Sequence, residues 1–168
     1  MHRRDFEEFY AANYGRIAAL VAAVTGSRDE ADDIAQETFA RALARWPRIG
    51  GYDLPEAWVR RVALRMAVDS ARRIRRVSKI LPSLRPPDRG GEPEPGDSLQ
   101  FSALGRALAR IPLREREAIV LFYVADLTAE QIAHDRGIPV STVRARLAAG
   151  RRRLERELEP DQEVTRDE

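Results

Sequence analysis

Cysteine is absent from the 168 residues, which excludes disulfide bonds, thiol redox chemistry and cysteine-ligated metal sites. Histidine occurs only at His2 and His134, and no nucleophile, base and orienting group can be assembled around either one. The longest apolar run, Ala118 to Ala125, is too short to cross a bilayer, and the N-terminus has no apolar signal core. We therefore expect a cytoplasmic protein with no membrane contact of its own, no catalytic residue, no metal and no cofactor.

Acidic residues are scarce in two segments, although the formal net charge is only +2. In residues 52–79 eight basic residues stand against three acidic ones, and in residues 101–158 eleven stand against seven. The first 50 residues are nearly balanced, and the last ten are acidic. Two separate basic zones indicate two separate contacts with a polyanion such as nucleic acid.

No segment shows the alternation of apolar and polar residues that is typical of a strand. From Phe6 to Val24 apolar residues recur every three to four positions, which predicts a first helix that Gly26 is expected to end. "SRDE" at 27–30 has the pattern of a capping box and predicts the start of a second helix. The outer face of that helix is predicted to carry Asp33, Gln36, Glu37, Ala40 and Arg41. Its buried face is predicted to comprise Ala31, Ile34, Ala35, Phe39, Ala42, Leu43 and Trp46.

A third helix is predicted from Pro55 to about Lys79, with one apolar and one basic side. An exposed Trp58 in a row with Arg61, Arg65 and Arg72 suits single-stranded or unwinding DNA, because bases stack on the ring and guanidinium groups hold phosphates. The alternative is that Trp58 only caps the core. The apolar side comprises Val59, Val62, Ala63, Met66, Ser70, Ile74 and Val77.

The segment "KILPSLRPPDRGGEPEPGD" contains five prolines and three glycines, which exclude a regular element and predict a linker over residues 79–100. Its roughly 19 residues span about 60 Å when extended, or about 18 base pairs of B-DNA. Two DNA-binding domains could therefore lie well apart on one duplex.

The second half has the spacing of a helix-turn-helix. Thr128 and Gln131 form a second capping-box pattern, Gly137 supplies the turn, and Pro139 suits the beginning of the next helix. His134 is expected to be exposed on the first helix of the motif. The second helix is expected to bury Val140, Val143, Leu147 and Leu154.

The opposite side of that second helix carries hydroxyls, arginines and alanines. Such side chains reach phosphates and base edges, and alanine permits close approach to a thymine methyl group. A solvated basic helix end is the alternative, since arginine also complements the helix dipole near a C-terminus. The candidate duplex-binding residues are Ser141, Thr142, Arg144, Ala145, Arg146, Ala148 and Arg151.

Three stretches together resemble the extracytoplasmic-function (ECF) sigma factors of bacterial RNA polymerase. They are "DEADDIAQETFARALARW", "PEAWVRRVALRMAVDSARR" and "LARIPLREREAIVLFYVADLTAEQIAHDRGIPVSTVRARL", in the family's order. The resemblance implies an all-α fold of two small helical domains. Residues 1–78 would bind core polymerase and melt the minus-ten element, and 101–158 would read the minus-thirty-five element. Residues 79–100 would link them, and 159–168 would form an acidic tail.

The resemblance also implies roles for particular residues. Asp33, Gln36, Glu37 and Arg41 fall on the polymerase-binding helix, while the Trp58 row and the Ser141 face fall on the melting and duplex-reading helices. The family often has asparagine where Arg65 stands, usually an apolar residue in place of Arg136, and frequently basic or bulky residues at positions 148 and 149. Core RNA polymerase and promoter DNA are the expected partners, and family members are commonly held inactive by an anti-sigma protein.

A different class remains open from the residues themselves. A stand-alone helix-turn-helix repressor would bind duplex operators as a dimer and would use its N-terminal half as a sensor or dimerisation domain. It would have no need for tryptophan and arginine beside an acidic-polar helix face. A helical adaptor would explain the folding pattern but not the two basic zones.

Overall fold

The computed structural model describes residues 2–81 and 103–159, and every regular element in these ranges is helical. This confirms the predicted all-α fold of two helical domains, whereas the linker and tail predictions fall mostly outside the described residues. The first domain contains α1 (His2–Thr25), α2 (Arg28–Ala44), α3 (Trp46–Ile49) and α4 (Pro55–Ile80). The second contains α5 (Ala103–Arg110), α6 (Leu113–Ile119), the π-helical turn η2 (Val120–Val124), α7 (Ala129–Arg136) and α8 (Val140–Leu158).

Aromatic side chains close one end of the first domain. Phe39 of α2 is almost fully buried, and its ring contacts Phe9 and Tyr10 of α1. Trp46 lies against Phe6 and Phe9, with ring centroids 5.2 and 4.9 Å apart. Burial of one such ring contributes about 1.5 to 3 kcal/mol to stability, so this cluster anchors α1 to α2 and α3.

The first helix ends and the second begins at the residues that the sequence predicts. Gly26 has a positive φ of 71°, which glycine adopts without steric cost, and α1 ends one residue before it. The Ser27 hydroxyl accepts a hydrogen bond from the backbone N–H of Glu30 at 3.3 Å and caps α2. The Glu30 carboxylate instead accepts a hydrogen bond from the Ser70 hydroxyl and pairs with Arg73, which ties α2 to α4.

The predicted burial is wrong for two residues, Leu43 and Val77. Leu43 is 50% exposed, because α3 turns back and its buried Trp46 and Ile49 fill the end of the core. Val77 is 40% exposed, because the last buried residue of α4 is Ser70 and the helix then extends beyond the bundle.

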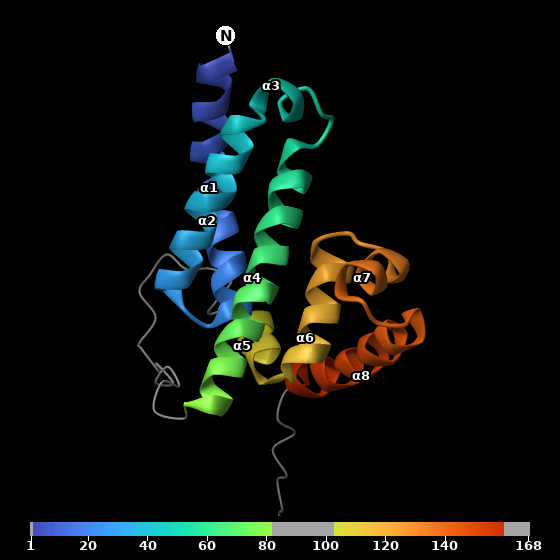
Figure 1. The fold of residues 1–168 in the computed structure, drawn as a ribbon. Helices are drawn as coiled ribbons and strands as arrows, with labels where there is room; N and C mark the ends of the chain where they lie inside the picture. Colours follow the sequence, from blue (N-terminus) through green and yellow to red (C-terminus); the bar gives the residue numbers. More distant parts are fainter. Residues whose placement is uncertain (1, 82–102, 160–168) are drawn as a thin grey trace, which may run out of the picture.

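The buried part of α4 is wider than one helical stripe. Leu64, Ala67 and Val68 are buried in addition to the predicted Val59 and Ala63. The reason is that α4 packs against α1 and α2 on one side and against α6 and η2 on the other. Figure 1 shows α4 running lengthwise between the two groups of helices.

The second domain has the predicted helix-turn-helix geometry. Thr128 and Gln131 form both hydrogen bonds of a capping box, at 3.1 and 2.9 Å, and start α7. Gly137 ends α7 in the left-handed region, with φ 63°, and Val143 and Leu147 of α8 are buried. These contacts fix α8 to α7 and leave its opposite side free.

A close crossing of α6 and α8 completes this domain. A Cβ atom on Gly150 would lie 2.8 Å from Ile119 Cγ1 and 3.3 Å from the Glu115 carbonyl oxygen. Only glycine therefore permits this separation of the two helices without a shift of neighbouring atoms. After α6 the chain widens into η2, and Asp126 then takes a positive φ of 55° before α7 begins.

Candidate polymerase and nucleic-acid interfaces

The outer face of α2 is polar and exposed, as predicted. Asp33, Gln36, Glu37 and Arg41 are all exposed, while Ala35, Phe39 and Ala42 on the other side are buried. Glu37 and Arg41 form an exposed ion pair of 2.7 Å one helical turn apart. Exposed pairs of this kind add little stability, so the face is free to bind a partner without loss of the fold.

The free side of α8 presents the predicted duplex-binding residues unevenly. Ser141, Arg144, Ala145 and Arg151 are exposed, whereas Thr142 and Ala148 are half-buried. Their spacing along α8 places Ser141, Arg144, Ala145 and Ala148 in one stripe. His134 on α7 is exposed, as expected.

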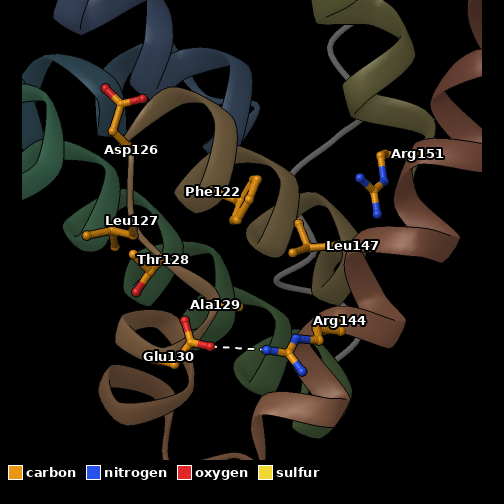
Figure 2. Close-up of a pocket in the computed structure, with 9 residues that line it drawn as sticks. All are labelled: Phe122, Asp126, Leu127, Thr128, Ala129, Glu130, Arg144, Leu147 and Arg151. Atoms are coloured by element: carbon orange, nitrogen blue, oxygen red, sulfur yellow. Dashed lines mark hydrogen bonds and ion pairs between the residues drawn. The ribbon is translucent and has the colours of Figure 1, made fainter.

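A hollow of about 630 Å³ lies between the start of α7 and this stripe. Figure 2 shows Arg144 of α8 reaching across to Glu130 of α7, with which it forms an exposed ion pair of 3.1 Å. Arg151 also lines the hollow, and its guanidinium donates a hydrogen bond to the Tyr123 hydroxyl at 3.0 Å. Because the Arg144 pair is exposed and weak, Arg144 can leave Glu130 for a stronger acceptor.

Arg146 lies apart from that stripe. It lines a separate hollow beside Arg72 of α4 and Arg114 of α6. Partial burial lowers the pKa of its guanidinium, and the nearby charges of Arg114 and Arg72 lower it further. In the closed arrangement described here, Arg146 therefore faces the first domain and is not grouped with Arg144.

The candidate strand-binding row on α4 also faces the second domain. The Arg61 guanidinium donates a hydrogen bond to the Ala125 carbonyl oxygen at 3.4 Å, and Arg65 pairs with Asp135 at 2.6 Å. Arg72 binds both carboxylate oxygens of Glu117, at 2.7 to 2.9 Å, and Glu117 is only 3% exposed. All three arginines thus already have acceptors in the second domain.

Trp58 differs from its prediction. It is half-buried and packs against the hydrophobic core, so it does not stand exposed in a row of arginines. This burial agrees with the core-capping alternative, although an indole that is half-exposed still has surface on which a base can stack.

Further polar contacts hold the domains together. Arg136, whose side chain is 8% exposed, pairs with Asp69 of α4, and Arg60 pairs with Asp126 at 3.1 Å. The Arg116 guanidinium donates to the carbonyl oxygen of Val24 at the end of α1, and burial lowers its pKa. The Asp69 pair gives a physical reason for arginine at position 136.

Sequence reasoning singled out Arg61, Arg65 and Arg72, but as DNA-binding residues, and it missed their partners in the second domain. Asp69, Glu117 and Asp135 interrupt the two basic zones, and their scattered placement was the only available signal. Helical periodicity shows which residues share a face, but not which face of another domain lies opposite. The pairing of acidic residues in one domain with arginines in the other therefore required the tertiary structure.

Residues 2–81 and 103–159 contain neither a membrane span nor a metal site. No helix there is long and apolar enough to cross a membrane. Within the same residues, no group of three or more His, Asp or Glu side chains is placed to hold a metal ion.

Comparisons with known proteins match both halves of the chain. Sigma-70 region 2 matches residues 9–77, and sigma-70 region 4 matches residues 101–154. The ECF RNA polymerase sigma factor SigE of Mycolicibacterium smegmatis is 28% identical over 89% of this chain, and the match spans only 60% of SigE. The ferric citrate uptake sigma factor FecI of Escherichia coli K12 is 30% identical over 85% of this chain and 84% of its own length.

A solved structure shows the same fold. The sigma factor RpoE from Bartonella quintana, in complex with the anti-sigma factor NepR, superposes with a TM-score of 0.63 at 22% identity. The match covers 95% of this chain and 99% of that one. A region 2 match beside the helix-turn-helix also distinguishes this chain from a stand-alone repressor. The chain belongs to the ECF sigma factors, which are not enzymes and through which RNA polymerase recognises promoters by regions 2 and 4.

Proposed function

We propose that residues 1–78 bind core RNA polymerase and hold the melted minus-ten strand, while residues 101–158 read the minus-thirty-five duplex in the cytoplasm. The observation that carries this assignment is the placement of α8. Its Val143 and Leu147 are locked into the domain, and Ser141, Arg144 and Ala145 remain exposed on its other side. A helix fixed in this way can enter a major groove with its first turns against base edges.

Promoter binding requires the two domains to separate. Arg61, Arg65 and Arg72 are bound to the second domain, so they cannot hold a DNA strand in the closed arrangement. A linker of roughly 19 residues, which spans about 60 Å when extended, would let each domain reach its own promoter element. The closed form is accordingly the free factor, and polymerase and promoter together select the open form.

An anti-sigma protein is a third proposed partner. The Bartonella quintana RpoE structure contains the anti-sigma factor NepR, and its fold matches both domains of this chain. Such a partner would act by covering the α2 face or the α4 row.

Charge reversal on the α2 face tests polymerase binding. In an Asp33→Arg/Glu37→Arg variant, both substituted side chains point to solvent, so the fold should persist. We expect holoenzyme assembly, measured by fluorescence anisotropy of the labelled factor with core polymerase, to weaken at least about tenfold, or about 1.4 kcal/mol.

The matched control for this test is Glu7→Arg/Glu8→Arg, which makes the same charge change at exposed positions of α1. It should assemble nearly as well as the unaltered protein. Equal weakening by both variants would mean that overall charge, and not the α2 face, controls assembly.

Arg144→Ala tests base readout by α8. If Arg144 makes a bidentate contact to one base, the variant should lose about 1 to 3 kcal/mol on the cognate duplex and little on a scrambled one. Quantitative gel shifts with the holoenzyme on both duplexes measure this difference.

Arg152→Ala provides the comparison, because Arg152 is exposed whereas Arg153 is held by Glu115 at 2.8 Å. This variant should weaken both duplexes alike, as expected for a phosphate contact. If Arg144→Ala behaves in the same way, Arg144 is also only a phosphate contact.

A further inference from the structure

Closure of the two domains creates a hollow of about 300 Å³. One wall is the C-terminal half of α4, and the other consists of α6 and the first half of α8. Figure 1 shows the C-terminal half of α4 and the beginning of α6 at the end of the molecule remote from α3. The lining residues are Arg72, Arg75, Arg76 and Lys79 of α4, Leu113, Arg114 and Glu117 of α6, and Arg146 of α8.

The charges of this hollow are unbalanced. Six cationic side chains line it, and Glu117 is the only carboxylate among the lining residues. Glu117 is already bound by Arg72 through both oxygens. The remaining five cations have no salt bridge or hydrogen bond to any carboxylate within the described part of the chain.

Several arginines outside the hollow do have carboxylate partners. Across the same domain interface, Arg60, Arg65 and Arg136 each pair with an aspartate. The lowered pKa of Arg146 reflects burial next to Arg114 and Arg72, so positive potential accumulates at the hollow. The five cations without a carboxylate partner are therefore available for an external anion.

We propose that this hollow binds a small polyphosphate, such as inorganic tripolyphosphate or the phosphate chain of a nucleotide, between the two domains. A planar guanidinium group can donate two parallel hydrogen bonds to the oxygens of one phosphate, and several arginines can bind adjacent phosphates at once. The volume falls at the lower end of the range for small-molecule sites. Two or three linked phosphates would supply negative charge to compensate the five cations that have no carboxylate partner.

The lining favours a small polyphosphate over a nucleic-acid strand. Sites for single strands combine cations with aromatic rings on which bases stack, and Leu113 is the only apolar residue that lines this hollow. Trp58 lies about 21 Å from Arg72 along α4, at 1.5 Å per residue, so it cannot supply a stacking surface here.

Binding at this site is coupled to closure. The cations of α4 belong to the first domain, and Arg114 and Arg146 belong to the second, so the complete cluster exists only while the domains are together. An anion that binds the closed form alone stabilises that form by mass action. The polyphosphate would therefore hold the factor closed and away from promoter DNA.

Calorimetric titration of inorganic tripolyphosphate into the full chain tests the proposal. At about 0.15 M salt, where charges more than about 8 Å apart are largely screened, we expect one site per chain. Arg76→Gln/Arg114→Gln removes one exposed cation from each wall and should weaken binding at least about tenfold. Arg45→Gln/Arg48→Gln makes the same charge change at exposed positions just before and within α3 and should change binding less than about twofold.

A variant that opposes closure and a titration with a single-stranded oligonucleotide test the proposal further. Asp69→Arg places a second cation against Arg136 and opposes closure from outside the hollow, so it should also weaken tripolyphosphate binding. Equal loss in the Arg45/Arg48 control would overturn the proposal, since binding would then be diffuse. Tighter binding of a single-stranded oligonucleotide than of tripolyphosphate, lost in Arg76→Gln/Arg114→Gln, would identify the hollow as a strand site and would also overturn it.

Discussion

Glu117→Gln is expected to open the free protein. Glu117 is the buried carboxylate that holds Arg72 across the interface, and without its charge Arg72 would face Arg114 and Arg146 uncompensated. Loss of one partner of a buried ion pair costs about 3 to 5 kcal/mol. The lower value of about 3 kcal/mol applies here, because the Arg72 side chain is still 28% exposed to solvent. The ratio of closed to open molecules should fall by roughly 150-fold, since 1.36 kcal/mol corresponds to a factor of ten.

Energy transfer between two dyes measures this opening directly. The chain has no cysteine, so cysteines introduced at the exposed positions Ala44 of α2 and Glu155 of α8 place one dye on each domain. Glu157→Gln is the matched control, because Glu157 pairs with Arg110 inside the second domain at 3.1 Å. Transfer should fall in Glu117→Gln and persist in Glu157→Gln. Unchanged transfer in both would show that closure does not depend on the Arg72 pair.

Much of each domain could be predicted because its signals are local in sequence. Gly26, Ser27 and the Thr128–Gln131 box act within a few residues, and each ends or begins a helix where expected. The stripe of Val143 and Leu147 likewise follows from helical spacing alone. The free side of α8 was predictable for the same reason.

The remaining features depend on contacts between residues far apart in sequence. Leu43 would be buried on a straight continuation of α2, but α3 closes that end with Trp46 and Ile49. Arg146 has the spacing of a residue beside the duplex-binding stripe, yet it faces Arg72 across the domain interface. Such positions follow from how α4 packs against α6 and η2, which no local pattern encodes.

Trp58→Ala should impair promoter opening more than promoter docking. If the half-exposed indole stabilises an unstacked base, the variant should lose about 1 to 3 kcal/mol, and only when the strands must open. Closed-complex formation should survive. Transcription from a duplex promoter should therefore fall roughly 5- to 150-fold and recover substantially on a template mismatched across the minus-ten element, which needs no protein-driven opening.

Met66→Ala separates this role from simple loss of packing. Met66 is half-buried on the same helix, packs against the same core and receives a weak hydrogen bond from the Thr38 hydroxyl at 3.7 Å. Its truncation should lower the melting temperature of the protein, because buried volume is lost, but should affect the duplex and mismatched templates equally. The template dependence of Trp58→Ala should exceed that of Met66→Ala at comparable stability. Equal defects of Trp58→Ala on both templates, with a lowered melting temperature, would assign Trp58 to the core alone.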